Sequence, residues 1–386
     1  MRNTTRRFVL ACVSSVLFIP AIFHGTSIAQ TNPPPADAHE LVTREPRTLT
    51  KPADISAARD LLDRARQNHD LHDIKTPYTL KVSFETSGAA QYEGAWTMEQ
   101  ISDGSHWRWS TQLGDLHMIR IGSDGHVYGT DPSAPVPLRV QEFRSALLRP
   151  ISHDAGDFAI RSANVERNGK TISCLLLSHS IPPNPAPRSW VEREDCIDSA
   201  TGLLQLWSEA PGIYAVYDYS GATSFHGHTL PRQVSIFEEG HLAVQARIES
   251  FEDAPNLDPD LFKLTPEMVD TGESFKLVSP RRLPMRVDPS DAPTSRFFQP
   301  VIVHVTLDEE GGVLDAEPLQ TSDRDLSLAA LELVKSTSFE PNGYQQEAFV
   351  NVQFHFPAAR WGGPPLLHSA VHWVNLDRRG PPVKHR

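Results

Sequence analysis

The stretch 299–356 constrains the fold more than any other part of this 386-residue chain. Its apolar residues first alternate with polar ones, which is typical of a strand, and a polar turn ending in Gly311 and Gly312 follows. Later apolar residues recur at helical spacing before alternation returns. In order, the pattern predicts strands over 301–307 and 313–317, a helix over 326–334 and a strand over 349–356. The segment is therefore expected to form a small β-β-α-β unit.

Five short motifs in this unit resemble the TonB C-terminal domain family. They are Val301-Ile302-Val303-His304-Val305-Thr306-Leu307-Asp308, the Gly311-Gly312 turn, Leu326-x-x-Ala329-Ala330, Phe339-x-Pro341 and Val352-Gln353-Phe354-x-Phe356. The resemblance implies an α+β module over 299–357 whose last strand lies at a sheet edge. Such an edge pairs with an extended peptide through free backbone groups.

The implied partner-binding strand has eight residues: Phe349, Val350, Asn351, Val352, Gln353, Phe354, His355 and Phe356. The partner would be a protein or extended peptide, and an outer-membrane transporter is one candidate. Three departures separate this chain from the family pattern. Ser327 replaces the usual Asp, Thr337 replaces the usual Trp, and no Tyr-Pro pair precedes the first strand. We therefore expect peptide binding or scaffolding rather than energy transduction.

The first 29 residues have the pattern of an export signal. Arg2, Arg6 and Arg7 precede an apolar run over 8–23, and Ser27-Ile28-Ala29 is a small-x-small cleavage site. The run contains a proline and is short for a membrane span. We expect an exported, periplasmic or cell-envelope protein with a cleaved signal, and retention as an anchor is the alternative.

Charge and cysteine content agree with that compartment. Removing the three arginines changes the formal net charge from −12 to −15, which argues against nucleic acid as a partner. Cleavage leaves Cys174 and Cys196, which we expect to form a disulfide in an oxidising compartment. A metal site or nucleophilic thiol is the alternative, although the chain has no C-x-x-C pair.

The middle region, 54–265, predicts one helix followed by a long antiparallel meander. Asp54 can cap the helix, and closely spaced short strands with tight turns run from 78 to 251. Three motifs resemble the LolA-like fold of lipoprotein carriers. They are Tyr92-x-Gly94-x-Trp96, Cys196-Ile197-Asp198-x-x-Thr201-Gly202-Leu203-Leu204 and Leu230-Pro231-Arg232. The resemblance implies an antiparallel β-rich half-barrel. The fold class of the whole chain is therefore predicted to be α+β.

Three segments outside these units have the composition of a leader, a linker and a tail. Residues 30–53 are polar and contain a proline run, so they predict a flexible leader. Residues 266–298 are proline-rich and predict a linker, and 358–386 are rich in glycine and proline and predict a disordered tail.

Two side-chain groups in the middle region could bind a ligand. His226 and His228 have H-x-H spacing, which suits zinc on a strand, but the sequence supplies no third ligand, and turn histidines are the more ordinary interpretation. Trp96, Trp107 and Trp109 could line a lipid-binding concavity or form ordinary sheet core, and the core interpretation is preferred.

No catalytic motif accompanies these groups, so we expect no enzyme activity and no cofactor. The first hypothesis is a non-enzymatic envelope protein in which a β-rich domain carries a peptide-binding module. The second is a periplasmic lipid or lipoprotein carrier that uses the concave face of the middle domain. An enzyme of unrecognised class comes last.

Overall fold

The computed structural model describes the chain from residue 46 to residue 353, with gaps. The described residues are 46–71, 74–87, 93–130, 136–151, 158–178, 192–210, 212–238, 240–273, 282–286, 301–318, 324–341, 343 and 345–353. The predicted export signal and tail lie outside them. No helix in these ranges combines the length and hydropathy needed to cross a bilayer.

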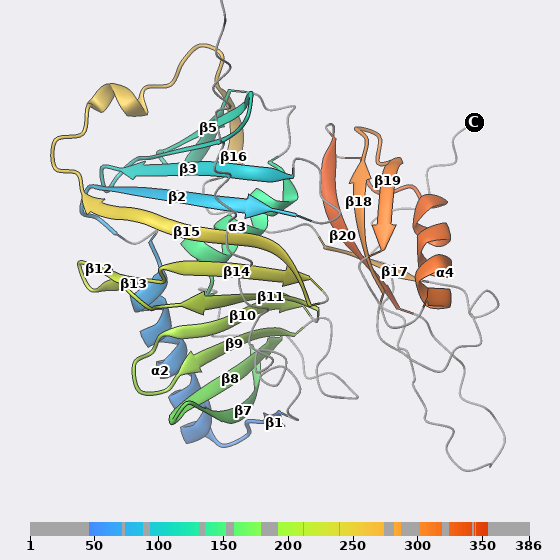
Figure 1. The fold of residues 1–386 in the computed structure, drawn as a ribbon, viewed down its shortest axis with the longest axis horizontal. Coiled ribbons are helices and arrows are strands. Elements are labelled where there is room, and N and C mark those ends of the chain that lie inside the picture. The colour runs from blue at the N-terminus through green and yellow to red at the C-terminus, as the bar shows by residue number, and fades with distance from the viewer. Residues whose placement is uncertain are drawn as a thin grey trace, which may run out of the picture. The chain divides into compact units, whose positions relative to one another are not determined.

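Most described strands belong to one antiparallel sheet of 14 strands (Figure 1). Its order is β1-β7-β8-β9-β10-β11-β14-β15-β2-β3-β4-β5-β6-β16. The strands are β1 (Arg47–Thr48), β2 (Tyr78–Thr86), β3 (Gly94–Ser102), β4 (Trp107–Leu113), β5 (Leu116–Ser123), β6 (His126–Gly129), β7 (Ala159–Arg167), β8 (Lys170–Ser178), β9 (Arg193–Asp198), β10 (Leu204–Ala210), β11 (Ile213–Asp218), β14 (Gln233–Glu238), β15 (His241–Asp253) and β16 (Val269–Glu273). A separate hairpin joins β12 (Thr223–Phe225) to β13 (His228–Leu230). The predicted antiparallel meander is confirmed.

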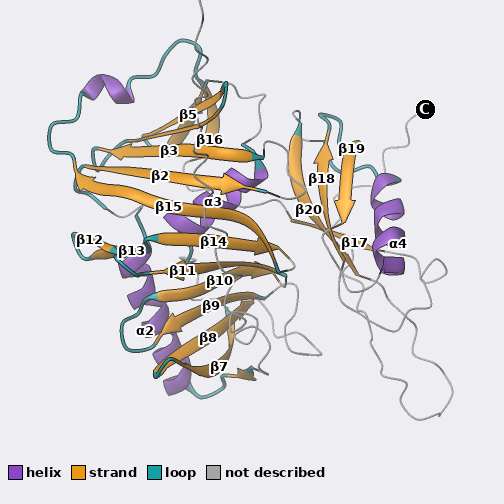
Figure 2. Ribbon diagram, in the orientation of Figure 1, coloured by secondary structure: helices purple, strands orange, loops and turns teal. Residues whose placement is uncertain are grey.

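Two helices, α2 (Pro52–His69) and α3 (Leu138–Leu148), cover one face of this sheet (Figure 2). The apolar side of α2, including Leu61 and Leu62, belongs to the same core as the inward residues of the strands. Phe143 of α3 stacks on Phe84 of β2, with 4.8 Å between ring centroids. Burial of these large apolar side chains is what holds the helices on the sheet.

The structure corrects three predictions about connections. The leader contributes β1, which pairs with β7, and Lys51 rather than Asp54 is the N-cap of α2. Asp54 instead lies in the first turn, where the helix dipole favours a carboxylate. The predicted linker contributes β16, which pairs with β6, and β17 (Arg282–Arg286) of the second sheet. The 3₁₀ turn η2 (Pro259–Phe262) lies just before this linker.

The second sheet has four strands in the order β17-β20-β18-β19. Its elements β18 (Val301–Leu307), β19 (Val313–Pro318), α4 (Arg324–Lys335) and β20 (Gln346–Gln353) confirm the predicted β-β-α-β order. Its core contains Val301, Val303 and Val305 of β18 together with Leu326 and Ala330 of α4. The alternating valines face the helix, as their period-2 pattern requires. We call this unit the C-terminal module.

The turn between β18 and β19 requires glycine at 311. Gly311 has φ +84°, and a Cβ there would lie 2.2 Å from the carbonyl oxygen of Phe339. The Gly311 carbonyl also accepts the Phe339 N–H at 2.8 Å, so the turn cannot move away freely. Gly343 has φ +74° but open space around it.

We therefore expect Gly311→Ala to destabilise the C-terminal module much more than Gly343→Ala. The second change adds only backbone strain, about 1 kcal/mol, whereas the first adds a backbone clash and should cost about 3 kcal/mol. Calorimetry of both full-length variants measures the difference. Equal destabilisation would contradict the importance of the Phe339 contact.

Candidate functional site

The strand predicted to bind a partner is not at the edge of its sheet. In the structure β20 pairs antiparallel with β18 on one side and parallel with β17 on the other. Val350, for example, faces Val303 of β18 and Leu283 of β17. The predicted strand also begins earlier and is described only to Gln353, so Phe354, His355 and Phe356 lie outside the described residues.

The strand β17 explains this correction. It has five residues, and its register runs from Arg282 opposite Phe349 to Arg286 opposite Gln353. Pro284 lies at its centre and has no N–H to give to a ladder. Parallel pairs are also slightly weaker per residue than antiparallel pairs. A short extended segment from a distant, proline-rich part of the chain thus pairs with the side of β20 that the sequence pattern predicted to be an open edge.

Polar residues lie on the face of β18 and β20 that is turned away from α4. His304 Nε2 lies 3.1 Å from Glu347 Oε2, and the imidazole meets the ring of Phe349 edge-on with 6.0 Å between centroids. The period of two places these residues opposite the valine face. Neither His304 nor Glu347 was singled out from the sequence, where an alternating polar residue looks like an ordinary solvent-facing position.

The three tryptophans of the middle region do not have a common role. Trp96 and Trp109 are buried in the core, and Trp96 stacks on Phe84 with rings nearly parallel. Trp107 is only partly buried and lines a cavity of about 180 Å³ at the β3–β4 and β5–β6 turns. The core interpretation therefore fits Trp96 and Trp109, and Trp107 alone reaches a space that a ligand could enter.

Arg144, which no sequence motif marks, lies on two of these tryptophans. The guanidinium carbon of Arg144, in α3, is 4.2 Å from the ring centroid of Trp109 and 5.9 Å from that of Trp107. Cation–π contact offsets part of the cost of placing this charge among aromatic rings. The pairing of Arg144 with residues about 35 positions earlier depends on which face of α3 meets the sheet, which a local sequence pattern does not give.

The two candidate zinc ligands occupy different structural positions. His226 lies in the turn of the β12–β13 hairpin with φ +46°, and its Nε2 is 2.7 Å from Asp253 Oδ1. His228 begins β13 instead. The zinc alternative needs both histidines on one face of a strand, and the turn between β12 and β13 does not provide that arrangement. The preferred interpretation, turn histidines, fits His226.

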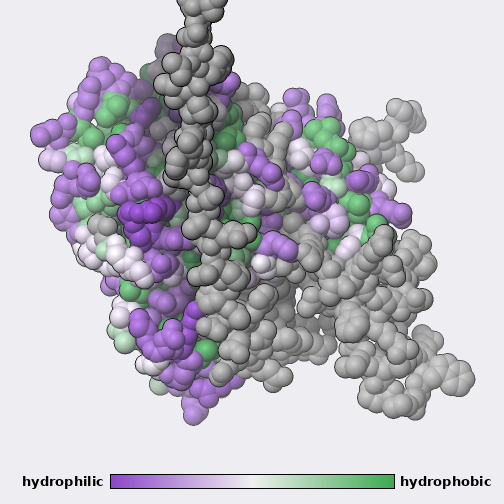
Figure 3. Space-filling model, viewed as in Figure 1, coloured by the Kyte–Doolittle hydropathy of each residue, from purple (hydrophilic) through white to green (hydrophobic). Residues whose placement is uncertain are grey.

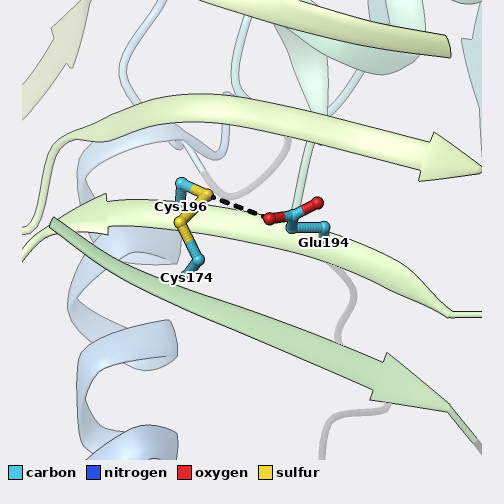
Figure 4. A group of neighbouring side chains, drawn as sticks. All are labelled: Cys174, Glu194 and Cys196. Atoms are coloured by element: carbon cyan, nitrogen blue, oxygen red, sulfur yellow. Dashed lines mark hydrogen bonds between the residues drawn. A yellow bond between two sulfur atoms is a disulfide. The ribbon is translucent and has the colours of Figure 1, made fainter. Parts of the chain in front are cut away.

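The disulfide between Cys174 and Cys196 is confirmed (Figure 4). The two cysteines lie opposite each other on β8 and β9, with 3.9 Å between their Cα atoms. Glu194 Oε1 lies 3.4 Å from the Cys196 sulfur. These three residues could otherwise supply metal ligands, but both sulfur atoms are already joined.

Few large hydrophobic side chains are exposed on the described part of the chain. Hydrophilic side chains cover most of the described surface on the side seen in Figure 3. The large hydrophobic side chains exposed in the described ranges are Leu264, Val269, Leu314 and Leu328. They come from three parts of the chain: Leu264 and Val269 lie in and just before β16, Leu314 lies in β19 and Leu328 lies in α4.

No protein-family model matches the sequence, and no curated protein matches it either. Among solved structures, the chain is similar to the LolA superfamily protein NE2245 from Nitrosomonas europaea at 12% identity and a TM-score of 0.38, over 54% of this chain and 97% of that one. A putative outer membrane lipoprotein-sorting protein domain from Vibrio parahaemolyticus has 11% identity and a TM-score of 0.35, over 54% and 95%. The complex of MucA and MucB from Pseudomonas aeruginosa has 14% identity and a TM-score of 0.27, over 74% and 99%.

Proposed function

We propose that this chain is a non-enzymatic binding protein of the cell envelope whose C-terminal module binds an extended protein segment by strand pairing. One observation carries the proposal: β20 already accepts an extended segment, β17, along five consecutive residues. Backbone groups supply most of the affinity in this mode, and no catalytic side chain is needed. The envelope location follows from the export signal predicted over residues 1–29.

The occupied edge changes how this function must be tested. Proline at Asn351 or Gln353 would be an obvious way to block an edge strand. Because β20 lies between two strands, that change would break the sheet itself and unfold the module. The informative position is β17, whose removal exposes the edge without altering β18, β19, α4 or β20.

The test uses the full chain with residues 282–286 replaced by Gly-Ser-Gly-Ser-Gly. A labelled peptide spanning 280–288 should bind this variant roughly tenfold more tightly than wild type, because wild type already fills the edge. A peptide of the same composition in scrambled order is the control, and fluorescence anisotropy measures both. If the variant melts like wild type but binds neither peptide, the proposal is wrong.

A lipid or lipoprotein carrier remains the second candidate. The observation in its favour is that α2 and α3 cover a broad apolar face of the large sheet, which would line a cavity if a helix moved away. Figure 2 shows both helices on the same side of the sheet. Organic extraction of the purified protein followed by mass spectrometry tests it, and a stoichiometric lipid would favour this candidate.

A further inference from the structure

Arg144 is a buried cation that has no acidic partner among the described residues. Its side chain is 7% exposed, and it rests on the indoles of Trp109 and Trp107. In the described part of the chain no carboxylate pairs with it, and its Nε–H has no acceptor. Buried charges are normally paired, because an unpaired one loses its hydration without compensation. This arrangement leaves a place for an anion.

A second cation, Arg120, makes the surroundings of the Arg144 guanidinium more electropositive. Arg120 of β5 is 8% exposed and lies directly across from Trp109 in the β4–β5 register. Burial, followed by the charge of Arg120, lowers the pKa of Arg144 to about 9. Arg144 is still charged near pH 7, so the two cations repel each other inside the protein.

The cluster also contains hydrogen-bond donors that no described residue accepts. Trp109 Nε1–H and Arg144 Nε–H are both buried and unsatisfied in the described chain. A buried donor that makes no hydrogen bond destabilises the folded protein by more than a typical hydrogen bond stabilises it. Two unsatisfied N–H donors beside two cations are the kind of group from which carboxylates and phosphates accept hydrogen bonds.

Trp107 connects this cluster to the cavity that it lines. It measures about 180 Å³ and is polar, with Lys75, Ser102, His106 and Asp124 in its wall. The Trp107 ring lies against Gly122, where a Cβ would come within 2.1 Å of the indole. Trp107 therefore belongs both to the cavity wall and to the surroundings of Arg144.

We propose that Arg144, Arg120, Trp107 and Trp109 bind the carboxylate or phosphate group of an anionic ligand that enters through this cavity. The ligand is either a small free anion or the head group of an amphiphile. The site lies wholly in the large sheet and α3, so it is independent of strand pairing in the C-terminal module.

The test compares wild type with Arg144→Met by thermal unfolding and tryptophan fluorescence. Without added ligand Arg144→Met should be at least as stable as wild type, because it removes a buried charge that no described carboxylate pairs with, while it keeps an unbranched apolar side chain. With inorganic phosphate or laurate, wild type should gain thermal stability, and Arg144→Met should bind roughly tenfold more weakly or not at all. Arg144→Lys keeps the charge without the planar group, so its affinity for these anions should lie between those of wild type and Arg144→Met.

The choice of probes separates the two sources of the anion. A response to phosphate identifies a free-anion site, and a response to laurate alone identifies an amphiphile head group. Lauryl alcohol is the ligand control, because it matches laurate but carries no charge. Arg108→Gln is the protein control, because Arg108 points to the opposite face of β4 from Trp107 and Trp109. The proposal fails if no anion shifts the wild-type melt, if laurate and lauryl alcohol bind equally, or if Arg144→Met responds like wild type.

Discussion

Lowering the pH from 7 to 4.5 should reduce the free energy of unfolding by roughly 2–3 kcal/mol through one residue, His69. His69 ends α2 and is 2% exposed. Its Nε2 accepts the backbone N–H of Leu204 at 2.9 Å, and the Tyr219 hydroxyl lies 3.1 Å from the same nitrogen. The nitrogen that accepts this bond cannot also carry a proton.

Burial, with a smaller contribution from His228, lowers the pKa of His69 from 6.5 to about 3. The unfolded chain therefore binds a proton near pH 6.5, whereas the folded protein remains unprotonated until about pH 3. Between these values protons favour the unfolded state. The stability that neutral His69 provides is present above pH 6.5 and is lost progressively as the pH falls.

The measurement is urea unfolding at several pH values from 7.5 to 4.5. His69→Gln retains an acceptor for Leu204 and should flatten the pH dependence, at the cost of some stability at pH 7.5. His117→Gln is the matched control, because His117 is exposed on β5 and should leave the slope unchanged. Asp103 and Asp198 have lowered pKa values and so lose their stabilising effect mainly below this range. A slope in His69→Gln equal to that of wild type would refute the assignment.

Local patterns were enough to predict much of the fold. Val301, Val303 and Val305 identified a strand with one face against a helix, and the glycines at 311 and 312 fixed the turn after it. The Cys174–Cys196 pair followed from compartment and strand order. In each of these cases the decisive interaction is either close in sequence or covalent.

Long-range pairing explains what the sequence did not reveal. The strand β17 has no alternation and contains Pro284, so only its pairing with β20, some 67 residues later, makes it a strand. Arg144 and His69 resemble ordinary helix residues until their contacts with Trp109 and Leu204 are known. Partner-binding edges and buried charges are properties of the assembled sheet, so a one-dimensional pattern does not contain them.

Breaking the Cys174–Cys196 bond should destabilise the protein by about 3 kcal/mol. The bond joins residues 22 apart, and in the chain-entropy account it acts by restricting the unfolded chain. Both cysteines are fully buried in a small apolar cluster that also contains Ile172 of β8, Leu206 of β10 and Phe237 of β14. Native packing around the sulfur atoms is therefore a second contribution.

Wild type in reductant and one double variant separate the contributions of the cross-link and of the packing. Wild type in reductant loses only the cross-link, whereas Cys174→Ala/Cys196→Ala also loses the sulfur atoms and leaves small cavities, so it should unfold at still lower denaturant. Mass spectrometry after alkylation must first show that the exported protein is oxidised. Two alkylated thiols in protein purified from the periplasm would end this argument. Equal stability of the oxidised and reduced proteins would mean that the strand ladder, which pairs β8 with β9 over six positions, holds these strands together without the bond.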